Sequence, residues 1–133
     1  MRSAILINGP PASGKTTIAK GIVATLNYPF FSIDVIKDVL FSNFGIGDRD
    51  FNRFVGSVSF QIIEKIITEF SFDSRVIIEA WFGSRIFKNV EERLNLIGIN
   101  QIIEIWCHAP GVILVERYLN RVNSRQTNLV YYK

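Results

Sequence analysis

The residues with the clearest chemistry form a glycine-rich segment near the start of the chain. Residues 9–16, Gly-Pro-Pro-Ala-Ser-Gly-Lys-Thr, match the pattern G-x-x-x-x-G-K-[ST] without deviation. The glycines let the backbone wrap closely around oxygen atoms, and loop N–H groups with a helix N-terminus supply a positive dipole. Lys15 adds a positive charge for the β- and γ-phosphates. The pattern therefore predicts a nucleotide-binding loop rather than an ordinary glycine turn before a lysine.

Two threonines follow Lys15. Thr16 is expected to offer its hydroxyl to Mg²⁺, and Thr17 can hydrogen-bond the α-phosphate, although a second threonine at the start of a helix is also ordinary. The predicted nucleotide contacts in this segment are Gly9, Ala12, Ser13, Gly14, Lys15, Thr16 and Thr17.

Two carboxylates follow short apolar segments that look like buried strands. Asp34 comes after residues 30–33 and Glu79 after residues 76–78. In open parallel sheets, ligands bind beyond the carboxyl ends of the strands, so both side chains should face the loop. We assign Asp34 the role of base or acceptor-orienting group, and Glu79 the magnesium shell with Thr16. The alternative for Asp34 is a plain N-cap of the next helix.

Three arginines recur late in the chain at a spacing of four residues. Arg117, Arg121 and Arg125 therefore share one helical face. Their guanidinium groups suit phosphate oxygens and would stabilise charge as a phosphoryl group moves, so we assign Arg117 and Arg121 a catalytic role. Arg117 and Arg125 are also expected to contact the nucleotide. The alternative is a solvated helix face.

The elements that position these residues alternate along the chain. Residues 4–7 read as a buried strand, residues 14–26 as a helix and residues 30–33 as a second strand. A short helix through Val39 follows, and then a longer helix capped by Asp48 or Asp50.

The second half repeats this alternation. After the strand at 76–78, Ser84 is the expected N-cap of a helix that ends before Gly98; a strand at 101–107 and a helix opened by Pro110 follow. Such alternation predicts an α/β fold with a parallel sheet and helices on both faces.

Composition narrows the function classes. The 133 residues make one domain, 48% hydrophobic and 20% charged, which excludes a disordered chain. The net charge is +3 without any basic run, so nucleic-acid binding is not indicated. The single Cys107 excludes an internal disulfide, and no apolar stretch is long enough to cross a membrane. We expect a cytoplasmic protein with no membrane partner.

Four segments together resemble the P-loop small-molecule kinases of the nucleoside-monophosphate-kinase-like group. These AAA-type ATP-binding kinases include zeta-toxin-like proteins and chloramphenicol phosphotransferase. The segments are residues 7–17, 31–34, 76–82 and 116–121. The resemblance implies a three-layer P-loop NTPase fold and ATP- and Mg²⁺-dependent transfer of the γ-phosphoryl group to a hydroxyl of an unidentified small molecule.

The resemblance also implies a division of labour within the single domain, residues 1–133. Residues 35–72 would form the acceptor-binding insertion and residues 110–126 a lid helix region. In that group, the aspartate that matches Asp34 is a base or substrate anchor. The arginines that match Arg117 and Arg121 lie in the lid and contact the adenine or the phosphates.

One departure from the group concerns the end of the chain. Relatives continue into a fifth strand, whereas this sequence stops at Lys133, so we expect the last strand to be missing and the edge beside residues 101–107 to be exposed. A homodimer could cover that edge. Two alternative functions stay open: an ATP-binding module without transfer activity, and a nucleic-acid end kinase suggested by the pI of about 9.2.

Tryptophan and phenylalanine follow Glu79 closely, at positions 81 and 82. Trp81 and Phe82 can stack on an aromatic acceptor or a nucleobase, since they lie at the ligand-binding edge of the predicted sheet. Packing in the core or at its rim explains them equally well.

Overall fold

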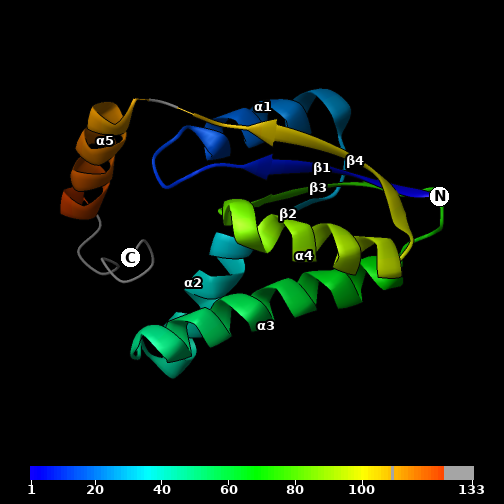
Figure 1. Cartoon of the computed structure of the whole chain (residues 1–133), viewed down its shortest axis with the longest axis horizontal. Helices are drawn as coiled ribbons and strands as arrows, with labels where there is room; N and C mark the ends of the chain where they lie inside the picture. Colours follow the sequence, from blue (N-terminus) through cyan, green and yellow to red (C-terminus); the bar gives the residue numbers. More distant parts are fainter. Residues whose placement is uncertain (109, 125–133) are drawn as a thin grey trace.

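The computed structural model describes residues 1–108 and 110–124, with side chains for all of these except 83–88, 118 and 121–124. Helices and strands alternate as expected (Figure 1). The elements are β1 (Arg2–Asn8), α1 (Lys15–Leu26), β2 (Phe30–Ser32), α2 (Ile33–Phe44), α3 (Arg49–Thr68), β3 (Arg75–Ala80), α4 (Gly83–Leu96), β4 (Ile99–Trp106) and α5 (Gly111–Ser124).

The described strands form one parallel sheet in the order β2-β3-β1-β4. Ile7 of β1 pairs with Glu79 of β3, which in turn pairs with Ser32 of β2. β3 therefore lies beside β1, as the assignment of Glu79 requires. Because the strands are parallel, their carboxyl ends share one edge of the sheet, where the glycine-rich loop begins.

Helices cover both faces of the sheet (Figure 1), which confirms the three-layer α/β arrangement. On one face, Ile7 and Ile77 pack with Ala19 of α1. On the other, strand residues such as Leu6 and Ile78 pack with Ile63 of α3 and with α4. Alternate strand residues point to opposite faces, so strands covered on both sides read as continuous apolar runs.

The segment around Asp34 differs from the expectation in one respect. β2 ends at Ser32, and the Ser32 side chain accepts a hydrogen bond from Val35 N at 3.4 Å, so Ser32 is the N-cap of α2. Asp34 lies inside the first helical turn and is not the cap. The helix also runs to Phe44 rather than ending near Val39.

Asp48 is the N-cap of α3, and Asp50 lies within its first turn. The Asp48 carboxylate accepts a hydrogen bond from Phe51 N at 2.8 Å, which satisfies one of the N–H groups that a helix start leaves without a partner. The structure thus decides between the two capping aspartates.

The expected starts of the last two helices shift by a residue or two. Phe82, not Ser84, is the N-cap of α4, and the Phe82 side chain makes no capping hydrogen bond. α5 begins at Gly111, and the Pro110 carbonyl accepts from Leu114 N at 3.0 Å, so Pro110 immediately precedes the helix.

β4 is an edge strand. Among residues 1–108 and 110–124, no strand pairs with its outer side, and Ile103 at its centre is 64% exposed. Residues 125–133 lie outside the described residues. Within the described ranges, no helix has the length and apolar character needed to cross a membrane.

Candidate functional site: the glycine-rich loop and the carboxyl edge of the sheet

The loop between β1 and α1 has the backbone conformation of an anion-binding turn. Ala12 and Gly14 have left-handed φ values of 65° and 89°, and Ser13 N donates to Pro10 O at 3.2 Å. Backbone turns of this kind direct successive N–H groups into a concavity that binds anions. Gly14 is also the N-cap of α1, so the positive end of the helix dipole faces the same space.

Gly9 allows the loop to pack tightly against the end of β4. A Cβ atom at Gly9 would lie 2.6 Å from Ser13 Oγ and 2.7 Å from the carbonyl oxygen of Cys107, distances that real Cβ atoms do not adopt. The neighbouring Ser13 Oγ is buried and has no hydrogen-bond partner among the described residues. Leaving such a hydroxyl unpaired costs about 1–3 kcal/mol, so a ligand oxygen would be a favourable partner.

Lys15 folds back over the loop. Its side chain is 5% exposed, and Nζ donates to Gly9 O at 3.1 Å. The ammonium group therefore lies at the loop, where phosphate oxygens can take over its hydrogen bonds.

The pKa of the Cys107 thiol responds to burial and to two charged residues of the site. Burial raises the pKa of its thiol; the positive charge of Lys15 opposes this and the carboxylate of Glu79 adds to it. Burial is the largest of these causes, in keeping with Cys107 as a small buried core residue.

The two predicted magnesium ligands are in direct contact. Thr16 Oγ1 donates to Glu79 Oε1 at 2.9 Å, and Glu79 is 2% exposed. Mg²⁺ prefers oxygen ligands and commonly keeps several waters and substrate phosphates in its shell. One hydroxyl and one carboxylate next to the phosphate loop fit this donor set.

Of the three arginines, Arg117 is the one whose side chain the structure describes, and it reaches the loop. Arg117 Nη1 of α5 donates to Ala12 O at 3.5 Å, a long hydrogen bond that places a guanidinium group beside the loop. Arg121 lies on α5, but its side chain is outside the described set, and Arg125 is outside the described residues altogether.

Asp34 and Thr17 lie at the same edge without joining these contacts. Asp34 is partly buried in the first turn of α2, two residues beyond Ser32, which pairs with Glu79. The hydrogen bonds described above do not reach it. Thr17 lies exposed in the first turn of α1.

Asn8 is the residue that sequence reasoning missed. It is 1% exposed; its Oδ1 accepts from Phe82 N at 3.0 Å and its Nδ2 donates to Glu104 Oε1 at 3.0 Å. Its backbone oxygen also accepts from Cys107 N at 2.7 Å. A buried amide at the end of an apolar strand is the signal that could have drawn attention to it, because buried polar groups need partners.

Comparisons with known proteins identify a family and several kinases that this chain resembles. Residues 5–78 match the profile of the family described as "ATPase family associated with various cellular activities (AAA)". Human adenylate kinase 8 is 29% identical over 96% of this chain, and cytidylate kinase of Sulfurisphaera tokodaii is 27% identical over 96%. A crystal structure of a "putative kinase" from Chloroflexus aurantiacus superposes with a TM-score of 0.83 at 27% identity over 99% of the chain.

These relatives differ in how much of their own length is matched. The chain spans 27% of human adenylate kinase 8, 76% of the cytidylate kinase and 72% of the Chloroflexus chain.

Proposed function

The chain belongs to the AAA family of ATPases, and from that premise we propose that it is an ATP- and Mg²⁺-dependent phosphotransferase. It transfers the γ-phosphoryl group to a hydroxyl of a small molecule. The observation that carries the proposal is the glycine-rich loop with its buried Lys15 and the Thr16–Glu79 pair. The likeness to two nucleotide kinases supports phosphoryl transfer rather than simple nucleotide hydrolysis.

In this proposal, the loop N–H groups and Lys15 bind the β- and γ-phosphates. Thr16 and Glu79 hold Mg²⁺, which neutralises charge on the phosphate oxygens. Arg117 stabilises charge on the transferring group together with Arg121, and Arg125 extends the nucleotide contacts. Asp34 accepts the proton of the acceptor hydroxyl or orients that hydroxyl.

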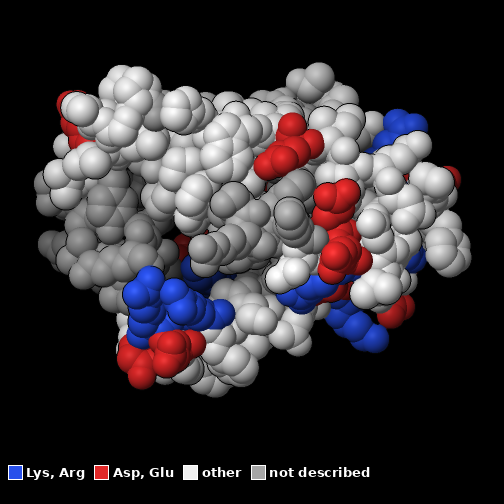
Figure 2. Space-filling view, viewed as in Figure 1, with Lys and Arg blue, Asp and Glu red and all other residues white. Residues whose placement is uncertain are grey.

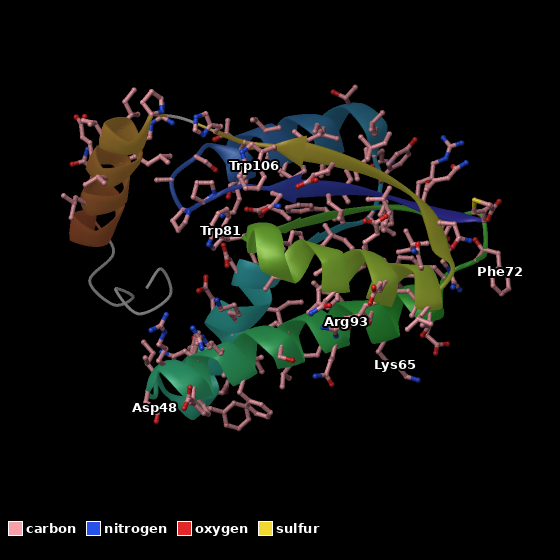
Figure 3. All side chains as sticks on the ribbon, in the orientation of Figure 1. Asp48, Lys65, Phe72, Trp81, Arg93 and Trp106 are labelled. Atoms are coloured by element: carbon pink, nitrogen blue, oxygen red, sulfur yellow. The ribbon has the colours of Figure 1, made fainter. Side chains whose placement is uncertain are left out.

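The acceptor side is assigned to residues 35–72, and the lid to residues 110–126. Figure 2 shows that Lys and Arg side chains at the α2–α3 end lie beside Asp and Glu side chains. Asp48, labelled in Figure 3, marks this end. The mixed charge supports a small-molecule acceptor over nucleic acid. A cytoplasmic location supplies ATP and keeps Cys107 reduced.

The first experiment measures Mg·ATP binding by calorimetry for the unmodified chain and for Lys15→Ala. We expect saturable binding that weakens at least about tenfold in the variant, since charge-assisted contacts to phosphate are strong. EDTA should weaken binding through loss of the metal held by Thr16 and Glu79. Binding that is independent of both Mg²⁺ and Lys15 would contradict the proposed nucleotide site.

Catalysis is tested by ADP release over a panel of hydroxyl acceptors that includes AMP and CMP. Asp34→Asn should lower kcat by about 10²–10⁴-fold, the usual contribution of a general base, with Mg·ATP affinity unchanged. Asp38→Asn, one turn along α2 and exposed, is the matched control and should keep full activity. Saturable ATP binding without transfer to any acceptor would instead support the ATP-binding module.

A further inference from the structure

The two tryptophans of the chain come together at the carboxyl edge of the sheet. Trp81 follows β3 and Trp106 ends β4, and their ring centroids are 5.8 Å apart with the planes inclined at 47°. Figure 3 shows both labelled side chains at the end of the sheet where β1 leads into the glycine-rich loop. They are 47% and 50% exposed, so each indole keeps substantial surface available.

Asn8 fixes this pair relative to the phosphate loop. Its side chain binds the backbone N–H of Phe82, the residue after Trp81, and the carboxylate of Glu104 on β4. Its backbone oxygen binds the N–H of Cys107, the residue after Trp106. Because Gly9 follows Asn8 directly, both tryptophan-bearing segments are tied to the residue that opens the loop.

Trp106 lies on the face of the sheet that α3 and α4 cover. Ile102 packs with the cluster under these helices, whereas Ile105 packs with the cluster under α1, so strand alternation places Trp106 on the α3–α4 face. Phe82, next to Trp81, packs edge-on against Phe60 of α3 at 6.2 Å. α3 belongs to the segment assigned to the acceptor, so Phe82 connects the segment that carries Trp81 to the acceptor side of the loop.

From this arrangement we propose that Trp81 and Trp106 bind a planar aromatic ring of the phosphoryl acceptor. The acceptor is then a hydroxyl compound that carries such a ring, either a nucleobase or a non-nucleotide aromatic group. Indole faces bind flat rings by offset or tilted stacking, and the inclined pair leaves ring surface free for this. The inference deepens the proposed function and rests on it for the identification of the ligand as acceptor.

Binding is measured by tryptophan fluorescence of the full chain saturated with Mg²⁺ and a non-hydrolysable ATP analogue. Two matched pairs of probes differ in the ring: AMP against ribose 5-phosphate, and benzyl alcohol against cyclohexylmethanol. We expect a saturable change with at least one ring-bearing probe, at an affinity at least about tenfold above that of its ring-free match. The pair that responds distinguishes a nucleobase from a non-nucleotide ring.

Variants locate the binding surface. Trp81→Leu leaves Trp106 as reporter and Trp106→Leu leaves Trp81, and each should lose at least about tenfold in affinity for the ring-bearing probe. Trp81→Phe and Trp106→Phe keep an aromatic face and should retain most of it. Affinity for the ATP analogue, followed by calorimetry, and the thermal unfolding midpoint should stay unchanged in all four variants.

Three outcomes would overturn the proposal. The first is equal affinity for ring-bearing and ring-free probes, and the second is no saturable fluorescence change with either ring-bearing probe. The third is a fluorescence change caused by the ATP analogue alone, after which no probe changes the fluorescence further. The last would mean that adenine occupies the pair. Phosphoryl transfer with no ring preference would refute this inference alone, whereas ring binding without any transfer would refute the proposed function alone.

Discussion

Gly9 shows how a single residue determines the shape of the phosphate loop. Its missing side chain lets the loop backbone lie against both Ser13 and the carbonyl of Cys107. At Gly14 the requirement is different, since a Cβ atom there would meet open space and the left-handed φ is what favours glycine. Gly9 is thus required for close packing, whereas Gly14 is required for its backbone conformation.

Gly9→Ala should destabilise the chain by about 1–3 kcal/mol, the range for overpacking, and should weaken Mg·ATP binding because the loop must shift. Urea denaturation and calorimetry measure the two effects. Gly21→Ala is the matched control: it lies exposed on α1 with nothing near its Cβ position. It should stabilise the chain by about 0.5–1 kcal/mol. Equal behaviour of the two variants would contradict the close packing at Gly9.

Cys107 makes stability depend on pH above neutrality. Because burial raises the pKa of its thiol, the folded state keeps the proton at pH values where the unfolded thiol, with a pKa of about 8.5, has lost it. The stability that the buried, protonated thiol contributes is therefore fully present below about pH 8.5. It is lost as the pH rises through the folded-state pKa. As the pH rises above about 8.5, we expect the free energy of unfolding to fall more steeply in the unmodified chain than in Cys107→Ala. Parallel pH profiles of the two proteins would argue against the shift.

At the scale of elements, α3 is the longer helix of the segment that we propose binds the acceptor. Its residue Phe60 packs against Phe82. The helix begins after the N-cap Asp48, close to the end of α2. The local sequence specifies this start well, because Asp48 is followed by polar residues and then by an apolar stripe at helical spacing. The sequence did not show whether Asp48 or Asp50 is the N-cap, since the two residues are only two positions apart.

Asp48→Ala should destabilise the chain by about 1 kcal/mol, through loss of the hydrogen bond to Phe51 N. Asp50→Ala removes an acidic residue of the first turn, which the helix dipole favours, and should cost about 0.3–1 kcal/mol. Equilibrium urea unfolding of both variants provides the comparison. A larger loss for Asp50→Ala would reverse the assignment of the cap.

At the scale of the whole molecule, the open side of β4 is the feature with consequences for assembly. The strand pairs with β1 on one side, and on its other side with no strand of residues 1–108 and 110–124. Unpaired N–H and C=O groups on an edge strand favour pairing with another chain, and the exposed Ile103 adds apolar surface. We propose that two copies of the chain associate through this edge.

Sedimentation velocity at increasing concentration should then show a monomer–dimer equilibrium for the unmodified chain. Ile103→Lys places a charge at the centre of the strand and should shift the equilibrium towards monomer. Val112→Lys is the control, because Val112 is also apolar and exposed but lies on α5. A monomer at every concentration, or equal effects of the two lysines, would refute association through β4.

The sequence by itself determined the parts of the site that are contiguous or follow from strand order. The loop residues are neighbours in the chain, so their motif specifies their chemistry directly. Glu79 could be placed at the loop because ligands of parallel sheets bind beyond the carboxyl ends of the strands, and the pairing of β3 with β1 brings it into contact with Thr16. The alternation of strands and helices likewise predicted the three layers, since strands buried on both faces have a distinct pattern.

Only the tertiary structure decided which distant side chains meet. Asn8 binds partners 74 and 96 positions away, and Arg117 reaches a carbonyl 105 positions away. The contact between Trp81 and Trp106 depends in the same way on the register of β4 against β1. Register and loop path are set by the packing of the whole core, and a shift of one residue would turn each strand side chain to the other face. Local sequence patterns therefore do not predict the strand register or the loop path.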